Sequence, residues 1–182
     1  MSLADEVFKL FERRGSDVYF GERISMTEHA LQAAWFARED SAPAAMVVAA
    51  LLHDIGHLVE SAPENLSDWK TDARHEEIGA RWLEQRMRPE VAGPVRLHVP
   101  AKRYLCATDH NYVAMLSHAS IITLKLQGGP MVGNELLQFE TEPYHKQAVR
   151  LRHWDDQGKI VGLKTPGLAE YRELIEELAL RA

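Results

Sequence analysis

A histidine and an aspartate stand side by side at the end of a long apolar run, AAMVVAALLHDIG, as His53 and Asp54. A buried carboxylate costs free energy unless it is neutralised or meets a cation, and a divalent metal ion is one such cation. Imidazole nitrogen and carboxylate oxygen together suit iron, manganese, zinc or nickel. Taken alone, the pair is better explained as a helix end with a hydrogen-bonded histidine, so a metal site requires further ligands.

Other histidines and carboxylates follow in an order that could supply those ligands. The order along the chain is H…HD…H…H…D, formed by His29, His53, Asp54, His75, His98 and Asp155. Asp156 is an alternative to Asp155, because the two side chains differ by about 100° around a helix. We prefer Asp155, since its three-residue spacing from Arg152 puts both on one helix face.

This order resembles the HD-domain superfamily, in which two extra histidines between HD and the last aspartate accompany a second metal. The resemblance implies a first metal held by His29, His53, Asp54 and Asp155. It implies that Asp54 bridges to a second metal, which His75 and His98 complete.

A closer resemblance runs over about residues 19–159, in the stretches LLHDIGHL, HVPAKRYL and LRHWDDQGK. These are similar to the HD-domain oxygenases of phosphonate degradation. The resemblance implies two iron ions in a mixed-valence Fe(II)/Fe(III) centre, with O2 as co-substrate. It implies cleavage of the C–P bond of a 1-hydroxy-2-(amino or trimethylammonio)ethylphosphonate, giving phosphate and glycine or glycine betaine. The protein would act downstream of a phosphonate hydroxylase.

Several further positions match that family. By resemblance, Tyr19 would occupy the open position of the second iron until substrate displaces it, with Glu22 assisting. Taken alone, the two residues are better explained as a tyrosine and a glutamate of a surface loop. A phosphonate dianion needs several charge-assisted donors, and the matching candidates are Lys102, Ser120 and Arg152. His57 would face the site or be a structural histidine. Candidates for an aromatic contact with a quaternary ammonium are Tyr19, Phe20, Trp69, Tyr104 and Tyr112.

The elements that must position these residues are helices. Apolar periodicity and capping signals predict helices at 3–14, 26–40, 43–56, 73–88, 110–127, 143–159 and 166–181. Gly56 is expected to end its helix, residues 57–72 to form a polar loop, and Asp72 to cap the next helix. Pro89, Pro94 and Pro100 are expected to break the stretch after residue 88 into short pieces. We therefore expect an all-α HD-domain bundle of about six to eight helices.

Length and composition limit the other possibilities. The 182 residues fit one domain, with a metal-site core at about 19–159 and a C-terminal helix at 166–181. A net charge of -6 argues against nucleic acid as a partner. No run approaches the roughly 18 apolar residues of a membrane span, and the charged N-terminus lacks signal-peptide character, so we expect a cytoplasmic protein. The single cysteine, Cys106, excludes an internal disulfide.

Two other functions remain open at this stage. An HD-type phosphohydrolase of a nucleotide or phosphate ester would use the same ligands to activate water and would not need O2. A non-catalytic HD ligand-binding module would normally have lost a metal ligand, whereas all the expected ligands are present. The expected partner in either catalytic case is a small molecule, here a hydroxyphosphonate.

Overall fold

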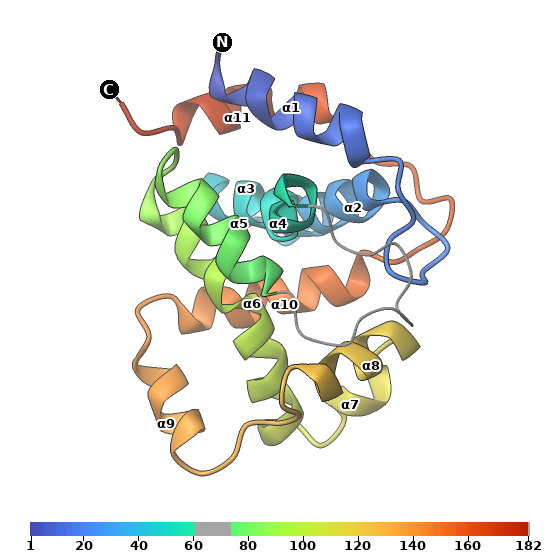
Figure 1. Ribbon diagram of the computed structural model, residues 1–182, viewed down its shortest axis with the longest axis vertical. Coiled ribbons are helices and arrows are strands. Elements are labelled where there is room, and N and C mark those ends of the chain that lie inside the picture. The colour runs from blue at the N-terminus through green and yellow to red at the C-terminus, as the bar shows by residue number, and fades with distance from the viewer. Residues whose placement is uncertain (61–73, 182) are drawn as a thin grey trace.

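The computed structural model describes residues 1–60 and 74–181, and they form helices joined by loops (Figure 1). The helices are α1 (Leu3–Arg14), α2 (Met26–Glu39), α3 (Ala44–Leu52), α4 (Ile55–Val59), α5 (His75–Glu84), α6 (Pro89–Thr108), α7 (Tyr112–Met115), α8 (His118–Leu126), α9 (Asn134–Thr141), α10 (His145–Gln157) and α11 (Arg172–Glu177), with a 3-10 turn at Leu168–Tyr171. Within these ranges, β-structure is limited to two isolated bridges. The all-α prediction is confirmed. The short α4, α7 and α11 account for most of the excess over the expected six to eight helices.

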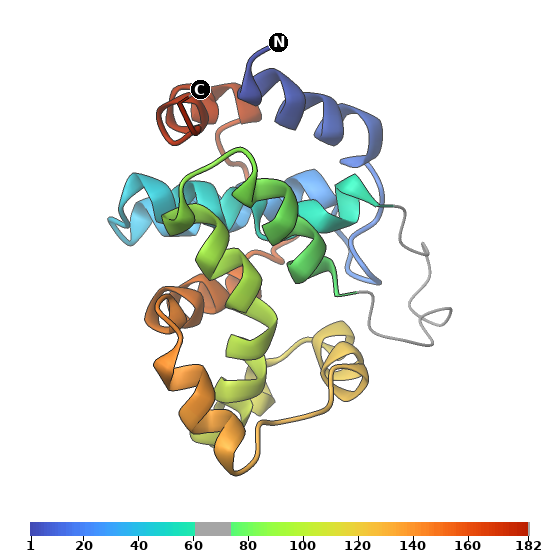
Figure 2. The same ribbon diagram turned by 60° about the vertical axis from the view of Figure 1, so that its left-hand side comes forward.

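The helices lie in layers that both ribbon views show (Figures 1 and 2). Helices α1 and α11 pack together at one end. Below them lie α2, α3 and α4, followed by α10 and the long α6, which runs through the molecule toward α7, α8 and α9. Helix α6 packs most extensively against α10 and α5, and α2 packs against both α3 and α10. Segments far apart in sequence are thereby brought together in the middle of the molecule.

Helix α3 is buried nearly all round, as its apolar sequence predicts. It ends earlier than expected, however. Leu52 is its last residue, and Gly56 lies inside the short helix α4 instead of ending α3. The glycine at position 56 allows α4 to lie close to the start of α5, since a Cβ on Gly56 would lie 2.0 Å from the backbone oxygen of His75. His53 and Asp54 therefore occupy the junction between two helices.

The expectation that prolines break the segment after residue 88 is wrong. Helix α6 runs unbroken through Pro94 and Pro100 and begins at Pro89, where proline is favourable because the first helical N–H needs no partner. The two internal prolines each remove a helical hydrogen bond. Burial of one side of α6 against α3, α5 and α10 compensates for this loss.

Other boundaries differ from prediction as well. The expected helix at 110–127 is two helices, α7 and α8, separated because Ser117 caps α8 by accepting a hydrogen bond from the backbone N–H of Ser120. Helix α9 was not predicted. The final helix is shorter than 166–181, because the chain after Leu178 pairs its backbone with Arg86 instead. The start of the predicted loop at 57–72 is instead part of α4, which ends at Val59 with Glu60 as its cap. Residues 61–72 of that loop, with the Asp72 cap, lie outside the described residues.

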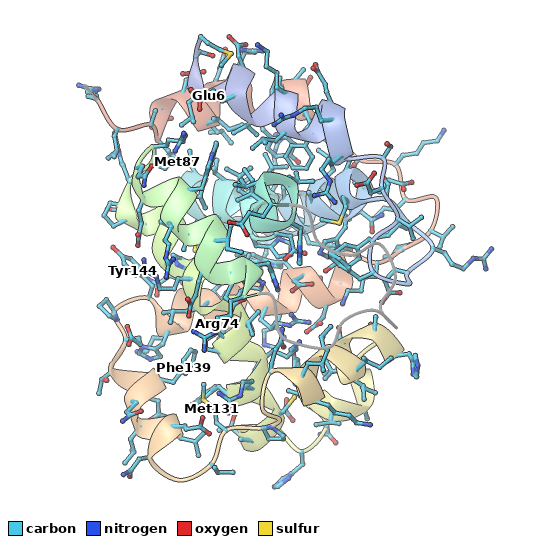
Figure 3. All side chains as sticks on the ribbon, viewed as in Figure 1. Glu6, Arg74, Met87, Met131, Phe139 and Tyr144 are labelled. Carbon is cyan, nitrogen blue, oxygen red and sulfur yellow. The ribbon has the colours of Figure 1, made fainter. Side chains whose placement is uncertain are left out.

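The buried hydrophobic residues form a main core and smaller separate clusters. The main hydrophobic core joins the layers of α1, α2, α3 and α11 to the near sides of α5, α6 and α10. A smaller cluster at the far end of α6 joins Leu97, Ala101, Met131, Phe139 and Ala148, and Figure 3 places the labelled Met131 and Phe139 there, away from Glu6 and Met87. Among the described residues, no helix is both long and apolar enough to cross a bilayer.

Candidate metal centre

Two groups of ligand atoms meet at Asp54, in the interior between the main core and α8. The first ligand group comprises His29 from α2, His53, one oxygen of Asp54, and Asp155 from α10. The second ligand group comprises the other oxygen of Asp54, His75 from α5 and His98 from α6. All six side chains are buried. The structure thus brings together every residue that the sequence pattern nominated as a ligand.

In the first ligand group, the atoms converge within contact distance of one another. The Nε2 atoms of His29 and His53 are 3.0 Å apart. Oδ2 of Asp54 lies 3.6 Å from the first nitrogen and 3.3 Å from the second. Oδ1 of Asp155 lies 3.4 Å from Nε2 of His29. Nitrogen and carboxylate donors in this arrangement suit a transition metal.

In the second ligand group, the other oxygen of Asp54 lies close to the two histidines. Its Oδ1 lies 3.2 Å from Nε2 of His75 and 3.5 Å from Nε2 of His98. The two histidine nitrogens are 3.2 Å apart. One carboxylate therefore presents a different oxygen to each pair of histidines, which is the geometry of a bridging ligand.

Backbone carbonyls orient three of the four histidines. Nδ1 of His29 donates to the carbonyl of Gly158 at 2.8 Å, and Nδ1 of His53 donates to Ala50 at 2.8 Å. Nδ1 of His98 donates to Val95 at 2.7 Å. Because a carbonyl can only accept, these Nδ1 atoms carry the protons of the neutral rings, and each Nε2 offers a lone pair. In two neutral rings the Nε2 lone pairs of His29 and His53 would face each other at 3.0 Å and repel, unless a proton or a metal ion lies between them, so the donor set fits a bound cation.

The electrostatics of the site favour a bound cation. Burial alone would raise the pKa of Asp54, but the surrounding imidazoles hold that pKa well below its usual value. Burial lowers the pKa of His53, yet the carboxylates of Asp54 and Asp155 outweigh it and raise the pKa to about 9. Burial lowers the pKa of His98 to about 4. In the metal-free protein, a proton on His53 therefore balances part of the carboxylate charge that a metal would balance.

The segment around Tyr19 covers the ligands from one side. The Tyr19 ring stacks on His29 with centroids 3.8 Å apart, and the Phe20 ring lies 4.3 Å from His57. Burial, followed by the charge of Asp54, raises the pKa of Tyr19 well above its usual value. The backbone turns tightly here, with φ of 35° at Phe20 and 79° at Gly21. This turn places Glu22 beside Tyr19 and Phe20, in the lining of one pocket.

A pocket of about 440 Å³, including its open mouth, lies directly over the second ligand group. Asp54, Asp155, His75 and His98 line it, whereas His29 and His53 do not. All the predicted substrate-side residues line it as well: Tyr19, Glu22, His57, Lys102, Ser120 and Arg152. His57 stacks on His75 at 4.0 Å, so it belongs to the wall of the site.

Lys102 is an unusual lysine, since its side chain is buried. Its Nζ donates to Oγ1 of Thr123 at 2.9 Å. Burial, followed by the charge of Arg152, lowers the pKa of Lys102 to about 7. An ammonium in this position would be stabilised by an anion in the pocket.

The two consecutive aspartates have different surroundings. Asp155 is close to His29, while Arg152 donates to its Oδ2 at 2.6 Å. Asp156 instead accepts hydrogen bonds from Arg152 and from the hydroxyl of Tyr112. This geometry favours Asp155 over Asp156 as the ligand.

Sequence reasoning missed several residues of the pocket wall, namely Thr123, Gln127 and Lys159. The four-residue spacing of Lys159 from Asp155 was an available signal. Of the aromatic candidates, Tyr19 and Phe20 line the pocket. Tyr104 instead donates to Glu140, and Tyr112 supports Arg152 from behind. Trp69 lies outside the described residues.

Comparison with known proteins identifies the class. The HD domain model matches residues 26–124, and the chain belongs to the HD-domain family. A [1-hydroxy-2-(trimethylamino)ethyl]phosphonate dioxygenase (glycine-betaine-forming) from Leisingera caerulea is 43% identical over 169 residues, which cover 93% of this chain and 86% of that protein. A hydroxymethylphosphonate dioxygenase from Gimesia maris is 43% identical over 171 residues, 93% of this chain and 85% of the relative. Within the family, the chain is therefore similar to HD-domain phosphonate dioxygenases, as the sequence resemblance predicted, and it has a His/Asp cluster that could hold metal ions.

Proposed function

We propose that the protein uses O2 to cleave the C–P bond of a 1-hydroxyphosphonate that carries an amino or trimethylammonio group on its second carbon. One O2 and one substrate would give a carboxylate, phosphate and a proton. The C1 carbon is oxidised by four electrons, and O2 accepts them. The organic product would be glycine or glycine betaine. A phosphonate hydroxylase acting upstream would supply the 1-hydroxyl group.

The observation that carries the proposal is the position of Asp54. Its two oxygens approach two separate histidine pairs, and the carboxylate lies at the base of a pocket with cationic and hydroxyl side chains in its wall. A two-metal site beside an anion-binding wall fits a substrate with a reactive carbon next to a phosphonate. The 43% identity to two phosphonate dioxygenases supports the same reaction class.

The metal would be iron at both positions, in the mixed-valence Fe(II)/Fe(III) state. The first ion would be held by His29, His53, Asp54 and Asp155, and the second by Asp54, His75 and His98. When bound, such a centre supplies the redox chemistry that O2 requires with an organic substrate. Imidazole and carboxylate donors are compatible with iron.

The protein side chains would position the substrate and exclude water. Lys102, Ser120 and Arg152 would receive the phosphonate, which orients C1 toward the second ligand group. Tyr19 covers the metal centre and would be displaced when substrate enters, with Glu22 assisting. His57 would contact the 1-hydroxyl from the wall beside His75.

The part of the pocket wall formed by Tyr19, Phe20 and Glu22 would suit a cation. Tyr19 and Phe20 provide aromatic faces, which attract quaternary ammonium groups. Glu22 lies beside them, and its Oε1 is buried without a hydrogen-bond partner among the described residues. A primary ammonium would satisfy this oxygen by a charge-assisted hydrogen bond. These contacts support an amino-substituted substrate in preference to hydroxymethylphosphonate.

Phosphate release tests the proposal. Iron-loaded protein is incubated with 1-hydroxy-2-aminoethylphosphonate, its N-trimethylated counterpart and hydroxymethylphosphonate, each with and without O2. We expect O2-dependent release of phosphate, fastest with a substrate that carries the cation. O2-independent hydrolysis of a phosphate ester, with no release from the phosphonates, would establish a phosphohydrolase instead. Absence of bound metal and of any turnover would indicate a ligand-binding module.

A further inference from the structure

The carbonyls that orient three of the ligand histidines come from different distances along the chain. His53 and His98 each donate from Nδ1 to the carbonyl three residues earlier, a partner that the local helical backbone places. His29 donates instead to the carbonyl of Gly158, which is 129 residues away. The orientation of the His29 ring therefore depends on how α2 and the end of α10 are held together.

Gln32 holds the chain just after Gly158 against α2. Its side chain is only 1% exposed, and it follows His29 by three residues in the same helix. Its Nε2 donates to the carbonyl of Ile160 at 2.8 Å, and its Oε1 accepts from the backbone N–H of Ile160 at 2.9 Å. The amide thus pairs with both polar backbone groups of one residue, and a reversed amide would place like atoms face to face.

The carbonyl of Gly158 lies between two fixed points. On one side, the N–H of Gly158 donates to two carbonyls in the last turn of α10, at 2.9 and 3.2 Å. On the other side, Ile160 is held by Gln32. A Cβ on Gly158 would lie 3.2 Å from a backbone nitrogen of α2 and 3.3 Å from the carbonyl oxygen of His29, so a side chain there would press against α2. The backbone is therefore held close enough for the His29 hydrogen bond.

Packing alone does not require a glutamine at position 32. Apart from His29, the other buried residues of α2 are alanines and a methionine. A buried amide costs free energy unless it is hydrogen-bonded. The side chain of Ile160 is 47% exposed, so its backbone groups lie near water that could satisfy them without Gln32. The two hydrogen bonds therefore do more for the position of this segment than for the satisfaction of its polar groups.

We propose that Gln32 is a positioning residue of the metal centre. By holding Ile160, it keeps the carbonyl of Gly158 on Nδ1 of His29. That hydrogen bond fixes the tautomer and the direction of the ring, so that Nε2 presents its lone pair to the first metal. Gln32 does not line the pocket and acts through the backbone. The inference rests on the part of the proposed function in which His29 binds a metal, and it does not depend on the substrate.

Four positions are changed to test this role. Gln32→Met removes both hydrogen bonds at similar side-chain length, and Gln32→Asn, a milder change, keeps the amide but shortens its reach. Gly158→Ala displaces the same carbonyl from the other side. Gln157→Met is the matched control, an exposed glutamine beside Gly158. Ile175→Ala, in the main core on α11, controls for a general loss of stability.

Co(II) is titrated into each metal-free protein, with and without His98→Ala, which removes a ligand of the second group. We expect both Gln32 variants and Gly158→Ala to weaken binding at the first group about tenfold, with less than about a twofold change at the second. Combining Gln32→Met with Gly158→Ala should add little, because both act on one hydrogen bond. The two controls should bind Co(II) as the wild type does.

Proton NMR of the Zn(II)-loaded protein gives a second readout, which needs no turnover. The Nδ1 proton of His29 is identified by its nuclear Overhauser effect to Gly158, and its exchange with water is measured. We expect faster exchange in the Gln32 variants than in the wild type and in Ile175→Ala. A residue with a purely structural role would lower the unfolding temperature without this change.

The outcomes separate this inference from the proposed function. Unchanged affinity at the first group with slow exchange of the His29 proton would overturn the positioning role, and so would equal weakening at both groups that Ile175→Ala reproduces. If the loss is selective but the wild-type protein releases no phosphate from hydroxyphosphonates, the positioning role stands and the proposed reaction is wrong. If the wild-type protein binds no Co(II), both proposals are wrong.

Discussion

The two ligand groups share Asp54 but differ in how they meet their surroundings. In the first, His29 and His53 are fully buried, and both rings are held by backbone carbonyls. In the second, His75 and His98 line the pocket, and His75 has a side-chain carboxylate, Glu76, at 3.6 Å from its Nδ1. Under the proposed function, the first group would retain a metal, and the second would also contact the substrate.

Removal of the shared ligand is expected to have the largest effect. Asp54→Ala eliminates the oxygen donors of both groups, so the variant should lose both metals and all detectable turnover. Metal analysis of the purified variant checks this, with the exposed Asp40→Ala as control. Full metal content with turnover in Asp54→Ala would disprove the shared site.

Removal of a ligand from one group alone should abolish binding of one metal ion and leave the other bound. His98→Ala removes a ligand of the second group only, so metal content should fall from two ions per chain to one, and turnover should stop. The remaining ion should exchange slowly with a chelator, because His29 and His53 of the first group do not line the pocket. Loss of both ions would show that the two groups bind metal as one cooperative unit.

The pH dependence of metal binding sharpens the comparison further. In the metal-free protein the pKa of His53 is raised to about 9, so below that pH a proton must leave before the first metal binds. The apparent affinity of the first group should thus rise with pH, by up to about tenfold per unit for one proton, and level off above about pH 9.

The His98→Ala variant isolates this effect, since only the first group then binds metal. Calorimetric titration in two buffers of different ionisation enthalpy gives the number of protons released near pH 7.5, and we expect about one. A pH-independent affinity with no proton release would contradict the raised pKa of His53.

The sequence predicted which residues gather at the candidate metal centre better than it predicted the elements that hold them. Imidazoles and carboxylates have few substitutes as metal donors, so the order of His29, His53 and Asp54 carried information without knowledge of the fold. The continuous helix through Pro94 and Pro100 could not be predicted, because it depends on burial against helices that are distant in sequence.

Supporting residues were missed for the same reason. Gln32 and Ile160 are 128 residues apart, and no local pattern links them. Tyr112 was considered as an aromatic contact, whereas its hydroxyl bonds to Asp156 and Arg152 behind the pocket. Roles of this kind follow from tertiary packing, while ligand identity follows from residue chemistry.

The smallest predicted effect concerns Glu76, the carboxylate near Nδ1 of His75 in the second ligand group. The corresponding partners of His29 and His53 are backbone carbonyls, which mutation cannot remove, so only the second group can be tested in this way. Glu76→Gln preserves size but removes the negative charge near His75. Charge near a ligating imidazole increases its basicity, so the second metal should bind about tenfold more weakly while the first is unaffected. Metal titration of the variant measures both affinities, with Glu77→Gln as control, a neighbouring glutamate whose side chain is 39% exposed and pairs with Arg74 and Arg81. If both metals bound equally more weakly, the charge of Glu76 would act on the whole centre through Asp54. The proposed difference between the two ligand groups would then be wrong.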